Sequence, residues 1–149
     1  MSNESVSAAS RDVVERYLAG EGGLLARGVE VWSIGVPADA DGDPDGTADY
    51  SDWGPQSFKD WRRTAPKMAE KASSAYSITP TAWTVDGERV AVEARGRMEL
   101  EDGRVYDNFY HLLYVVRDGQ ITRAHHYYDT AHFYAIFGPD PEAGRHGRR

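Results

Sequence analysis

The sequence predicts a single α+β domain in which helices pack on one side of a curved antiparallel sheet. Three observations support this class. Asp-Gly pairs recur at Asp86, Asp102 and Asp118, sixteen residues apart, between segments rich in β-branched and aromatic residues. The first half of the chain carries helical patterns instead. A length of 149 residues suffices for one hydrophobic core and leaves no room for two.

The first third of the chain is expected to form helices and one strand. Ser10 can cap a helix over Arg11–Ala19, whose apolar residues share one stripe and which ends in glycines. A second short helix is expected over Gly23–Arg27. The apolar segment Val29–Val36 then predicts a first strand.

An acidic loop is expected next. The segment Pro37–Gly54 holds six aspartates and no basic residue. Within it, Asp41 to Asp52 match the ligand positions of a calcium loop, although a strand precedes the loop where a helix is usual. A solvated loop without calcium is therefore the alternative. Pro55 suits the first turn of a following helix, which Pro66 ends or kinks.

The second half is expected to form four consecutive antiparallel strands separated by the Asp-Gly turns. The expected strands are Ala75–Val85, Arg89–Leu100, Arg104–Val116 and Gln120–Tyr128. Such long strands should bend strongly and carry bulges, so that the hollow side of the sheet can enclose a pocket.

Asp129 is expected to cap a last helix, Thr130–Phe137, which Gly138 and Pro139 end. The predicted organisation is a flexible amino terminus (1–9), one domain (10–138) and a disordered polar tail (139–149).

Composition excludes several classes of function. The formal net charge of −7 repels nucleic acid and anionic lipid. The absence of cysteine excludes thiolate nucleophiles and cysteine-bound metals. The sequence has no long apolar run and no basic, apolar leader at its start, so a cytoplasmic location is expected.

Four motifs carry a family resemblance. They lie at Val13–Tyr17, Tyr106–His111, Arg117–Ile121 and His126–His132. Through them the sequence resembles the NTF2-like superfamily, and within it the SnoaL-like and ketosteroid-isomerase-like proteins, over about residues 10–138. The resemblance implies a cone-shaped half-barrel of the NTF2-like (cystatin-like) fold, with a deep apolar pocket and usually a homodimer packed through the outer sheet face. Because this superfamily hosts several enzymes and also binding modules, membership does not fix the reaction.

The resemblance also implies catalytic residues. His111 stands where ketosteroid isomerases have a protonated aspartate in the oxyanion hole, and His126 stands where SnoaL-like polyketide cyclases have a basic aspartate. Tyr17 matches a tyrosine that donates a hydrogen bond to the substrate oxygen. The isomerase's proton-shuttling aspartate has no counterpart on the first strand, which argues against steroid isomerisation by the familiar route.

Strand alternation is expected to place His111 and His126 in one cavity. Imidazoles exchange protons near neutral pH, so His126 would act as the base and His111 as the acid or oxyanion donor. Tyr17 would be a second donor, and Asp129 could orient His126 or His132 in addition to capping its helix. The alternative for each residue is a structural role in the core or at a dimer interface.

Aromatic and apolar residues are expected to line a pocket for a flat hydrophobic substrate. The expected substrate-binding residues are Trp32, Phe58, Trp61, Tyr76, Phe109, Leu113 and Tyr128. No metal and no cofactor is expected, because His125 and His126 should point to opposite faces of the sheet.

The expected function is cofactor-free acid/base chemistry, which could be cyclisation, isomerisation or dehydration, on a hydrophobic carbonyl-bearing molecule of polyketide or steroid type. A non-catalytic module that binds an apolar ligand is the alternative. A homodimer is also expected, with Tyr110, Tyr114 and Tyr127 on its outer sheet face.

Overall fold

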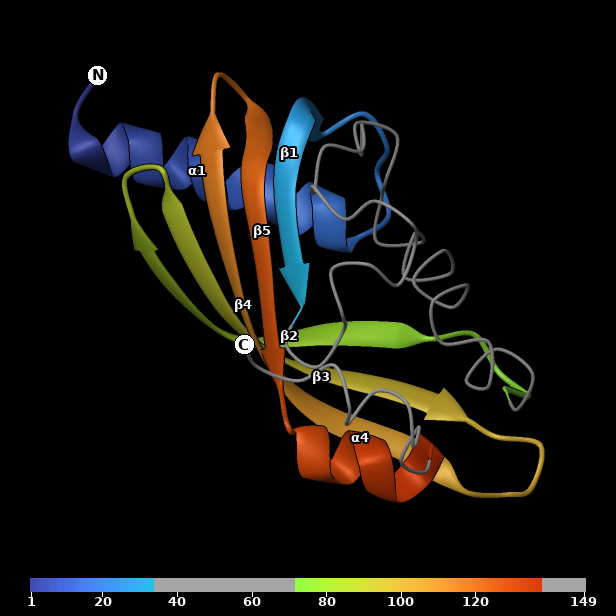
Figure 1. Cartoon of the computed structure of the whole chain (residues 1–149). Helices are drawn as coiled ribbons and strands as arrows, with labels where there is room; N and C mark the ends of the chain where they lie inside the picture. The colour runs from blue at the N-terminus through green and yellow to red at the C-terminus, as the bar shows by residue number, and fades with distance from the viewer. Residues whose placement is uncertain (34–71, 138–149) are drawn as a thin grey trace, which may run out of the picture.

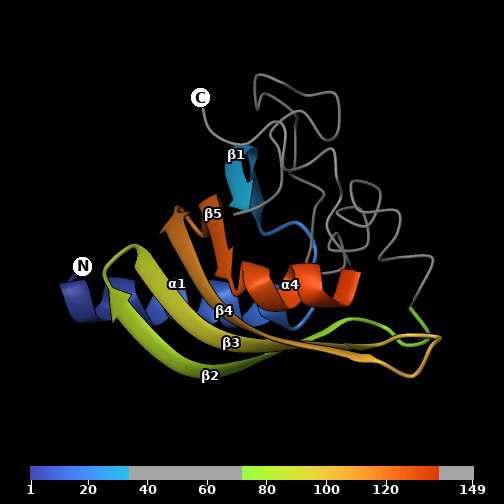
Figure 2. The same cartoon turned by 60° about the horizontal axis from the view of Figure 1, so that its bottom comes forward.

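The computed structural model describes residues 1–33 and 72–137. Five strands form one curved, unclosed sheet in the order β1-β5-β4-β3-β2 (Figure 1). Figure 2 shows α1 along the inside of the bend and α4 beyond the end of β5, which confirms the predicted α+β class. The elements are α1 (Asn3–Leu18), β1 (Leu25–Ser33), β2 (Ser77–Asp86), β3 (Arg89–Glu99), β4 (Val105–Arg117), β5 (Gln120–Tyr128) and α4 (Thr130–Phe137).

Helix α1 begins earlier than predicted. Ser2 caps it, because its side chain accepts a hydrogen bond from the Ser5 amide at 3.2 Å. Ser10, the predicted cap, lies buried inside the helix. A tertiary contact holds the early turns: the Ser7 hydroxyl accepts from the Gly87 amide at 2.8 Å, in the β2–β3 turn. The segment 1–9, expected to be flexible, is therefore largely helical.

The short helix predicted at Gly23–Arg27 is wrong, since β1 already begins at Leu25. Gly23 and Gly28 have positive φ values of 77° and 74°, which are incompatible with a helix over this segment. Strand β1 pairs with β5 in parallel, so the sheet is mixed and not purely antiparallel. The predicted acidic loop and the helix from Pro55 lie outside the described residues, and so do the calcium-loop positions.

The four later strands agree with the prediction to within two residues. Asp118 and Gly119 both have positive φ, as a tight hairpin turn requires. At the first hairpin, Asp86 pairs with Arg89, so the two turn residues are Gly87 and Glu88. The turn thus lies one residue later than the Asp86-Gly87 motif predicts, and only Gly87 has positive φ. The helix predicted at Thr130–Phe137 is confirmed.

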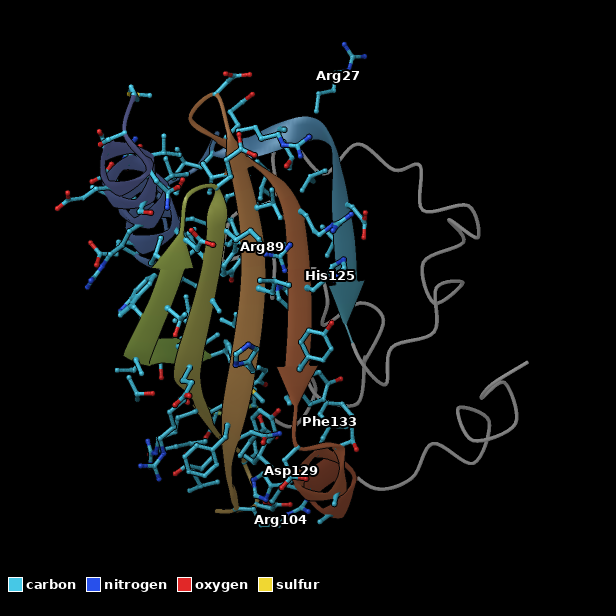
Figure 3. The ribbon with its side chains drawn as sticks, turned by 90° about the vertical axis from the view of Figure 1, so that its left-hand side faces the viewer. Arg27, Arg89, Arg104, His125, Asp129 and Phe133 are labelled. Carbon is cyan, nitrogen blue, oxygen red and sulfur yellow. The ribbon has the colours of Figure 1, made fainter. Side chains whose placement is uncertain are left out.

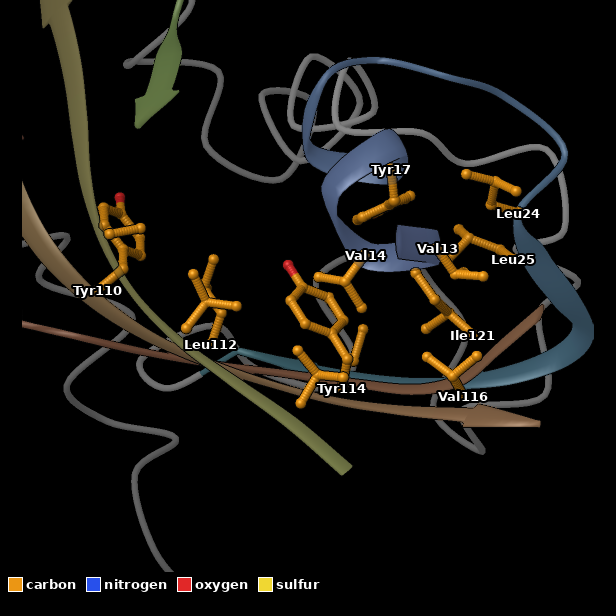
Figure 4. Close-up of a cluster of buried hydrophobic side chains, with 14 of the residues drawn as sticks. Val13, Val14, Tyr17, Leu24, Leu25, Tyr110, Leu112, Tyr114, Val116 and Ile121 are labelled. Carbon is orange, nitrogen blue, oxygen red and sulfur yellow. The ribbon is translucent and has the colours of Figure 1, made fainter. Parts of the chain in front are cut away.

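The core lies between α1 and the concave face of the sheet (Figure 4). Every second residue of β4, from Tyr106 to Val116, points inward and is buried. The stripe Val13, Val14 and Tyr17 of α1 packs onto this face. Burial of each such side chain contributes on the order of 1.5–3 kcal/mol, which makes α1 a structural part of the domain.

The two faces of β4 are the reverse of the prediction. Tyr110 and Tyr114, expected on the outer face, are only 4% and 0% exposed on the concave side. Phe109, expected inside, is 67% exposed on the convex side. The tyrosine face carries the larger rings and meets both helices, so it buries more apolar area than the Phe109 face would. Only Tyr127 lies on the outer face as predicted.

Candidate active site on the concave face

His126 is the buried imidazole of the concave face. It projects inward from β5 and is 7% exposed. Its ring centroid lies 6.3 Å from that of Tyr114 on β4, and Tyr114 in turn lies 5.8 Å from Tyr17 on α1. The structure therefore gathers two of the predicted catalytic residues, His126 and Tyr17, around a third ring that the sequence pattern assigned to the opposite face.

Burial sets the protonation of these groups. It lowers the pKa of His126 to about 4, and the neighbouring His125 lowers it further. The ring is consequently neutral at pH 7, and the ionisation near neutrality expected from the sequence is displaced toward acid. Burial raises the pKa of Tyr17 and of Tyr114, so both phenols keep their protons. The face therefore offers a neutral proton acceptor beside neutral hydrogen-bond donors.

A second polar group lies nearer to α4. The Tyr106 and Tyr110 hydroxyls are 2.6 Å apart, and the Asn108 amide nitrogen donates to the Tyr106 hydroxyl at 2.9 Å. The Tyr76 ring meets the Tyr110 ring edge to face, with the ring centroids 6.4 Å apart. Burial raises the pKa of Tyr106, Tyr110 and Tyr76, so this group is uncharged as well.

Asp129 caps α4 as predicted. Its carboxylate accepts from the Ala131 amide at 2.9 Å and from the His132 amide at 3.2 Å. The backbone carbonyl of Asp129 accepts from Asn108 at 2.9 Å, which joins the cap to β4. Both of these bonds go to the first turn of α4, as a helix cap requires, and the orienting role of Asp129 stays a prediction.

His111 lies on the opposite side of the sheet. It pairs in register with Tyr127, whereas Leu112 pairs with His126. Because successive residues of a strand alternate between faces, the expectation that both imidazoles line one cavity is wrong. His111 is exposed and lines an open hollow of about 620 Å³ on the convex face, together with Phe109.

The predicted substrate-binding residues divide between the faces. Tyr76 and Tyr128 pack against the concave core, and their role in substrate binding stays a prediction. Phe109 and Leu113 lie on the convex side, which corrects the prediction. The positions of Phe58 and Trp61 and the side chain of Trp32 lie outside the described residues.

Sequence reasoning missed the tyrosines of β4 as site residues. The signal that could have found them is the spacing of Tyr106, Asn108, Tyr110 and Tyr114, which puts all four on one face. That face also contains the only described buried polar side chain of the strand, Asn108. A buried amide needs hydrogen-bond partners, which favours the tyrosine face as the inner one.

Residues 1–33 and 72–137 contain neither a cluster of metal ligands nor a helix that could span a membrane. No three acidic, histidine or cysteine side chains gather there as metal ligands. Neither α1 nor α4 is long and apolar enough to cross a bilayer.

The family model for the SnoaL-like domain matches residues 37–124, more than half of the chain. The chain therefore belongs to the SnoaL-like family, and its architecture is the NTF2-like α+β fold. No curated protein matches the chain in sequence.

Solved structures agree on the fold. TerC, co-crystallised with polyporic acid, is 15% identical with a TM-score of 0.62, over 88% of this chain and 99% of its own. A candidate SnoaL-like polyketide cyclase from Jannaschia sp. CCS1 is 13% identical with a TM-score of 0.57, over 91% and 96%. IdmH, a candidate polyketide cyclase from Streptomyces antibioticus, is 16% identical with a TM-score of 0.56, over 87% and 99%.

Proposed function

We propose that this protein is an enzyme of the SnoaL-like kind that performs cofactor-free acid/base chemistry on a hydrophobic, carbonyl-bearing molecule of polyketide or steroid type. Cyclisation, isomerisation and dehydration all begin with the same step, removal of a proton next to a carbonyl. The observation that carries the proposal is the neutral, buried His126 beside phenol donors on the concave face.

The polarity of the concave face supports this class of substrate. Within the described residues, the buried polar side chains are Ser10, Asn108 and His126, and none carries a formal charge at neutral pH. An ionic ligand would lose its hydration there without gaining a counter-charge. A flat apolar molecule would instead pack on tyrosine rings, and its carbonyl oxygen would find phenol donors.

The chemistry assigned to the site is a proton transfer. The C–H bond next to the carbonyl breaks, the proton passes to the imidazole of His126, and the electron pair moves to the carbonyl oxygen. A phenol such as that of Tyr17 donates a hydrogen bond to this oxygen and stabilises its charge. In isomerisation, the imidazolium returns the proton to a different carbon of the substrate. In cyclisation, the enolate carbon instead attacks a second carbonyl carbon, and the imidazolium protonates the new alkoxide. In dehydration, a hydroxyl group takes that proton and leaves as water.

Hydrogen exchange at carbon tests the proposal without knowledge of the natural substrate. The probe is 2-tetralone, a flat bicyclic ketone, incubated with the protein in D₂O while NMR follows loss of its α-protons. We expect acceleration by the wild type and a loss of about 100-fold or more in His126→Gln, as for a general base. His111→Gln, on the other face, is the matched control and should keep the wild-type rate.

A non-catalytic binding module is the second candidate, because an uncharged aromatic face would equally hold an apolar ligand. It predicts that 2-tetralone raises the melting temperature while its α-protons exchange no faster than in buffer. That result would remove the enzymatic proposal. A cytoplasmic location stays a prediction, which cell fractionation tests.

We further propose that the convex face pairs with a second copy of the chain. Phe109 and Tyr127 are exposed on it, at 67% and 37%. Arg89 and Glu93 lie on the same face of β3, and neither forms an ion pair with another described residue. On β3, Arg89 and Glu93 lie two residues to either side of the position that pairs with Leu113 of β4. A two-fold axis that runs perpendicular to the strands at this position would place Arg89 of each copy opposite Glu93 of the other.

Charge reversal tests this pairing. Arg89→Glu and Glu93→Arg should each shift the protein toward a monomer in analytical ultracentrifugation, because each creates like charges across the axis. The double variant should recover the dimer. A wild type that is monomeric at micromolar concentration, or a double variant that stays as weak as the single ones, contradicts the proposal.

A further inference from the structure

The open hollow on the convex face combines a carboxylate with aromatic rings. It measures about 620 Å³ and lies on the side of the sheet opposite His126. Glu93 on β3 pairs in register with His111 on β4, which pairs with Tyr127 on β5. Neighbouring strands lie about 4.8 Å apart, so these three side chains stand next to one another in the hollow. Phe109, two residues before His111 on the same face of β4, also lines it.

The rings of this hollow are accessible to a ligand. Phe109 and Tyr127 are exposed, and so is His111. The His111 and Tyr127 rings are inclined by 63°, with their centroids 6.4 Å apart. The face of a phenyl or phenol ring carries partial negative charge, so it attracts cations as well as flat apolar groups. The rings therefore favour a flat ligand that is positively charged.

The protein already binds one planar cation beside this hollow. The Arg95 guanidinium donates two hydrogen bonds to the Asp107 carboxylate, at 2.5 and 2.6 Å. Its central carbon also lies 5.7 Å from the centroid of the Phe109 ring. A forked, planar cation thus meets a carboxylate and an aromatic face at the same time. This neighbouring group shows which chemistry such a combination accepts.

Glu93 offers the same combination without a cation of its own among the described residues. It forms no ion pair with any side chain that the structure describes, while Arg95, its neighbour on the same face of β3, is bound to Asp107. Glu93, Asp107 and Arg95 together leave an excess of one negative charge at the hollow. The formal net charge of −7 attracts cations to the whole molecule as well.

We propose that the convex hollow binds a small planar organic cation of the amidinium or guanidinium class. Two N–H groups of the cation donate to the Glu93 carboxylate, and its flat body packs against Phe109 and Tyr127. The inference is independent of the proposed function, because this site and His126 lie on opposite faces of the sheet. Arg89 of a second copy, which the proposed dimer places opposite Glu93, carries the same chemistry and would compete with the ligand.

Two ligands of nearly the same shape test the site at pH 7. Benzamidinium carries the planar cation, and benzamide is its neutral counterpart. Each is titrated into the protein while NMR follows the backbone amides. Glu93→Gln removes the charge and keeps the shape, and Glu101→Gln, in an exposed turn, is the matched control that loses the same formal charge. Arg89→Gln removes the competing guanidinium, and Phe109→Leu removes an aromatic face.

The site predicts a loss that is selective for charge and for position. The wild type, or Arg89→Gln where a second copy competes, should bind benzamidinium about fivefold or more tightly than benzamide. In the same background, Glu93→Gln should raise the Kd of benzamidinium about fivefold or more and change that of benzamide less than about twofold. Glu101→Gln should change neither Kd by more than about twofold, because exposed charges at that distance are screened by salt. Phe109→Leu should raise the Kd of benzamidinium about threefold, as for loss of a cation–π contact.

Four results overturn the site. One is equal binding of the two ligands, and another is an equal loss in Glu93→Gln and Glu101→Gln, which marks attraction by net charge alone. The third is the absence of saturable binding in both the wild type and Arg89→Gln. The last is a set of amide shifts centred on His126, which would place the ligand on the concave face. Binding that appears only in Arg89→Gln supports the site, since it shows that a second copy occupies the same hollow.

Discussion

The two faces of the sheet differ in how their polar groups are satisfied. On the concave face, tyrosines, an amide and one imidazole are buried and uncharged, and Tyr106 bonds to both Tyr110 and Asn108. On the convex face, arginines and carboxylates form exposed pairs such as Arg123 with Glu30, at 3.1 Å. Figure 3 shows Arg89 and His125 projecting from this face. The same strands thus have a buried, uncharged face on one side of the sheet and an exposed, charged face on the other.

Adjacent residues can therefore have opposite chemistry. His125 on the convex side contacts the Glu30 carboxylate at 2.6 Å, which holds the pKa of Glu30 below its usual range. His126, one residue later, is buried and neutral. A bulge at Thr122 sets this alternation, since Val115 pairs with Arg123 while Val116 pairs with Ile121. One extra residue thereby decides which histidine enters the core.

The largest expected contrast between the faces comes from neighbouring leucines. Leu112 is fully buried on the concave side, and Leu113 lies partly exposed on the convex side. Leu112→Ala should lower the free energy of unfolding by about 2–5 kcal/mol, because it leaves a cavity, and Leu113→Ala by about 1 kcal/mol or less. Urea denaturation of both variants measures the difference. A greater cost for Leu113 would mean that the faces are assigned the wrong way round.

The pH dependence of stability should separate the histidines. Because the folded pKa of His126 is about 4 and its ordinary value is 6.5, the unfolded chain takes up the proton first as pH falls. Stability should consequently decline between about pH 6.5 and 4, by roughly 3 kcal/mol at most from this group. Denaturation at several pH values should show a shallower decline in His126→Gln and the full decline in His111→Gln. Parallel curves for all three proteins would contradict the burial of His126.

A smaller contrast concerns two glycines. Gly96→Ala should cost about 1–3 kcal/mol, because the added methyl group meets the Tyr76 hydroxyl and the Tyr110 ring. Gly22→Ala is the matched control, since no atom lies within 4 Å of the place that its Cβ would occupy and it lacks a positive φ. Thermal melting of the two variants tests this. Equal melting temperatures would show that the tyrosines can move aside.

The smallest effect is expected at His111. Its side chain is exposed, and its ring lies 6.4 Å from that of Tyr127. His111→Ala should therefore change the free energy of unfolding of the monomer by no more than about 0.5 kcal/mol. A loss of several kcal/mol, measured by urea denaturation below the concentration of any dimer, would show that the convex face contributes to the core.

Much of the fold could be predicted because its signals are local. Turn residues and β-branched runs located four strands, and the Asp129 cap located α4. Two features were not predicted, because each depends on contacts between segments that are distant in the sequence. Ser2 replaces Ser10 as the cap because the β2–β3 turn holds the early part of α1. The parallel pairing of β1 depends on β5, which is about ninety residues away in the chain.

The site could be predicted only in part because strand alternation does not say which face is inside. His126 was placed correctly with its neighbour Tyr128, while His111 was placed on the wrong side. The family resemblance matched positions along the chain and did not indicate which face of the sheet is buried. Because β4 carries apolar residues on both faces, its sequence pattern does not identify the inner face either. The burial of Tyr110 and Tyr114 and the partners of Asn108 show that the tyrosine face is the inner one.

Helix α4 is hydrogen-bonded at both of its termini to β4 and to the turn before it. Figure 3 shows Arg104, Asp129 and Phe133 in this region. The Arg104 side chain donates to the Ile136 carbonyl at 2.6 Å, and Asn108 holds the Asp129 carbonyl at the opposite terminus. In between, the His132 ring accepts from the Asp107 amide at 3.2 Å. Because these three hydrogen bonds hold α4 along its length, the helix should not fray from one terminus. Its amide protons should therefore exchange with solvent together, in a single cooperative opening.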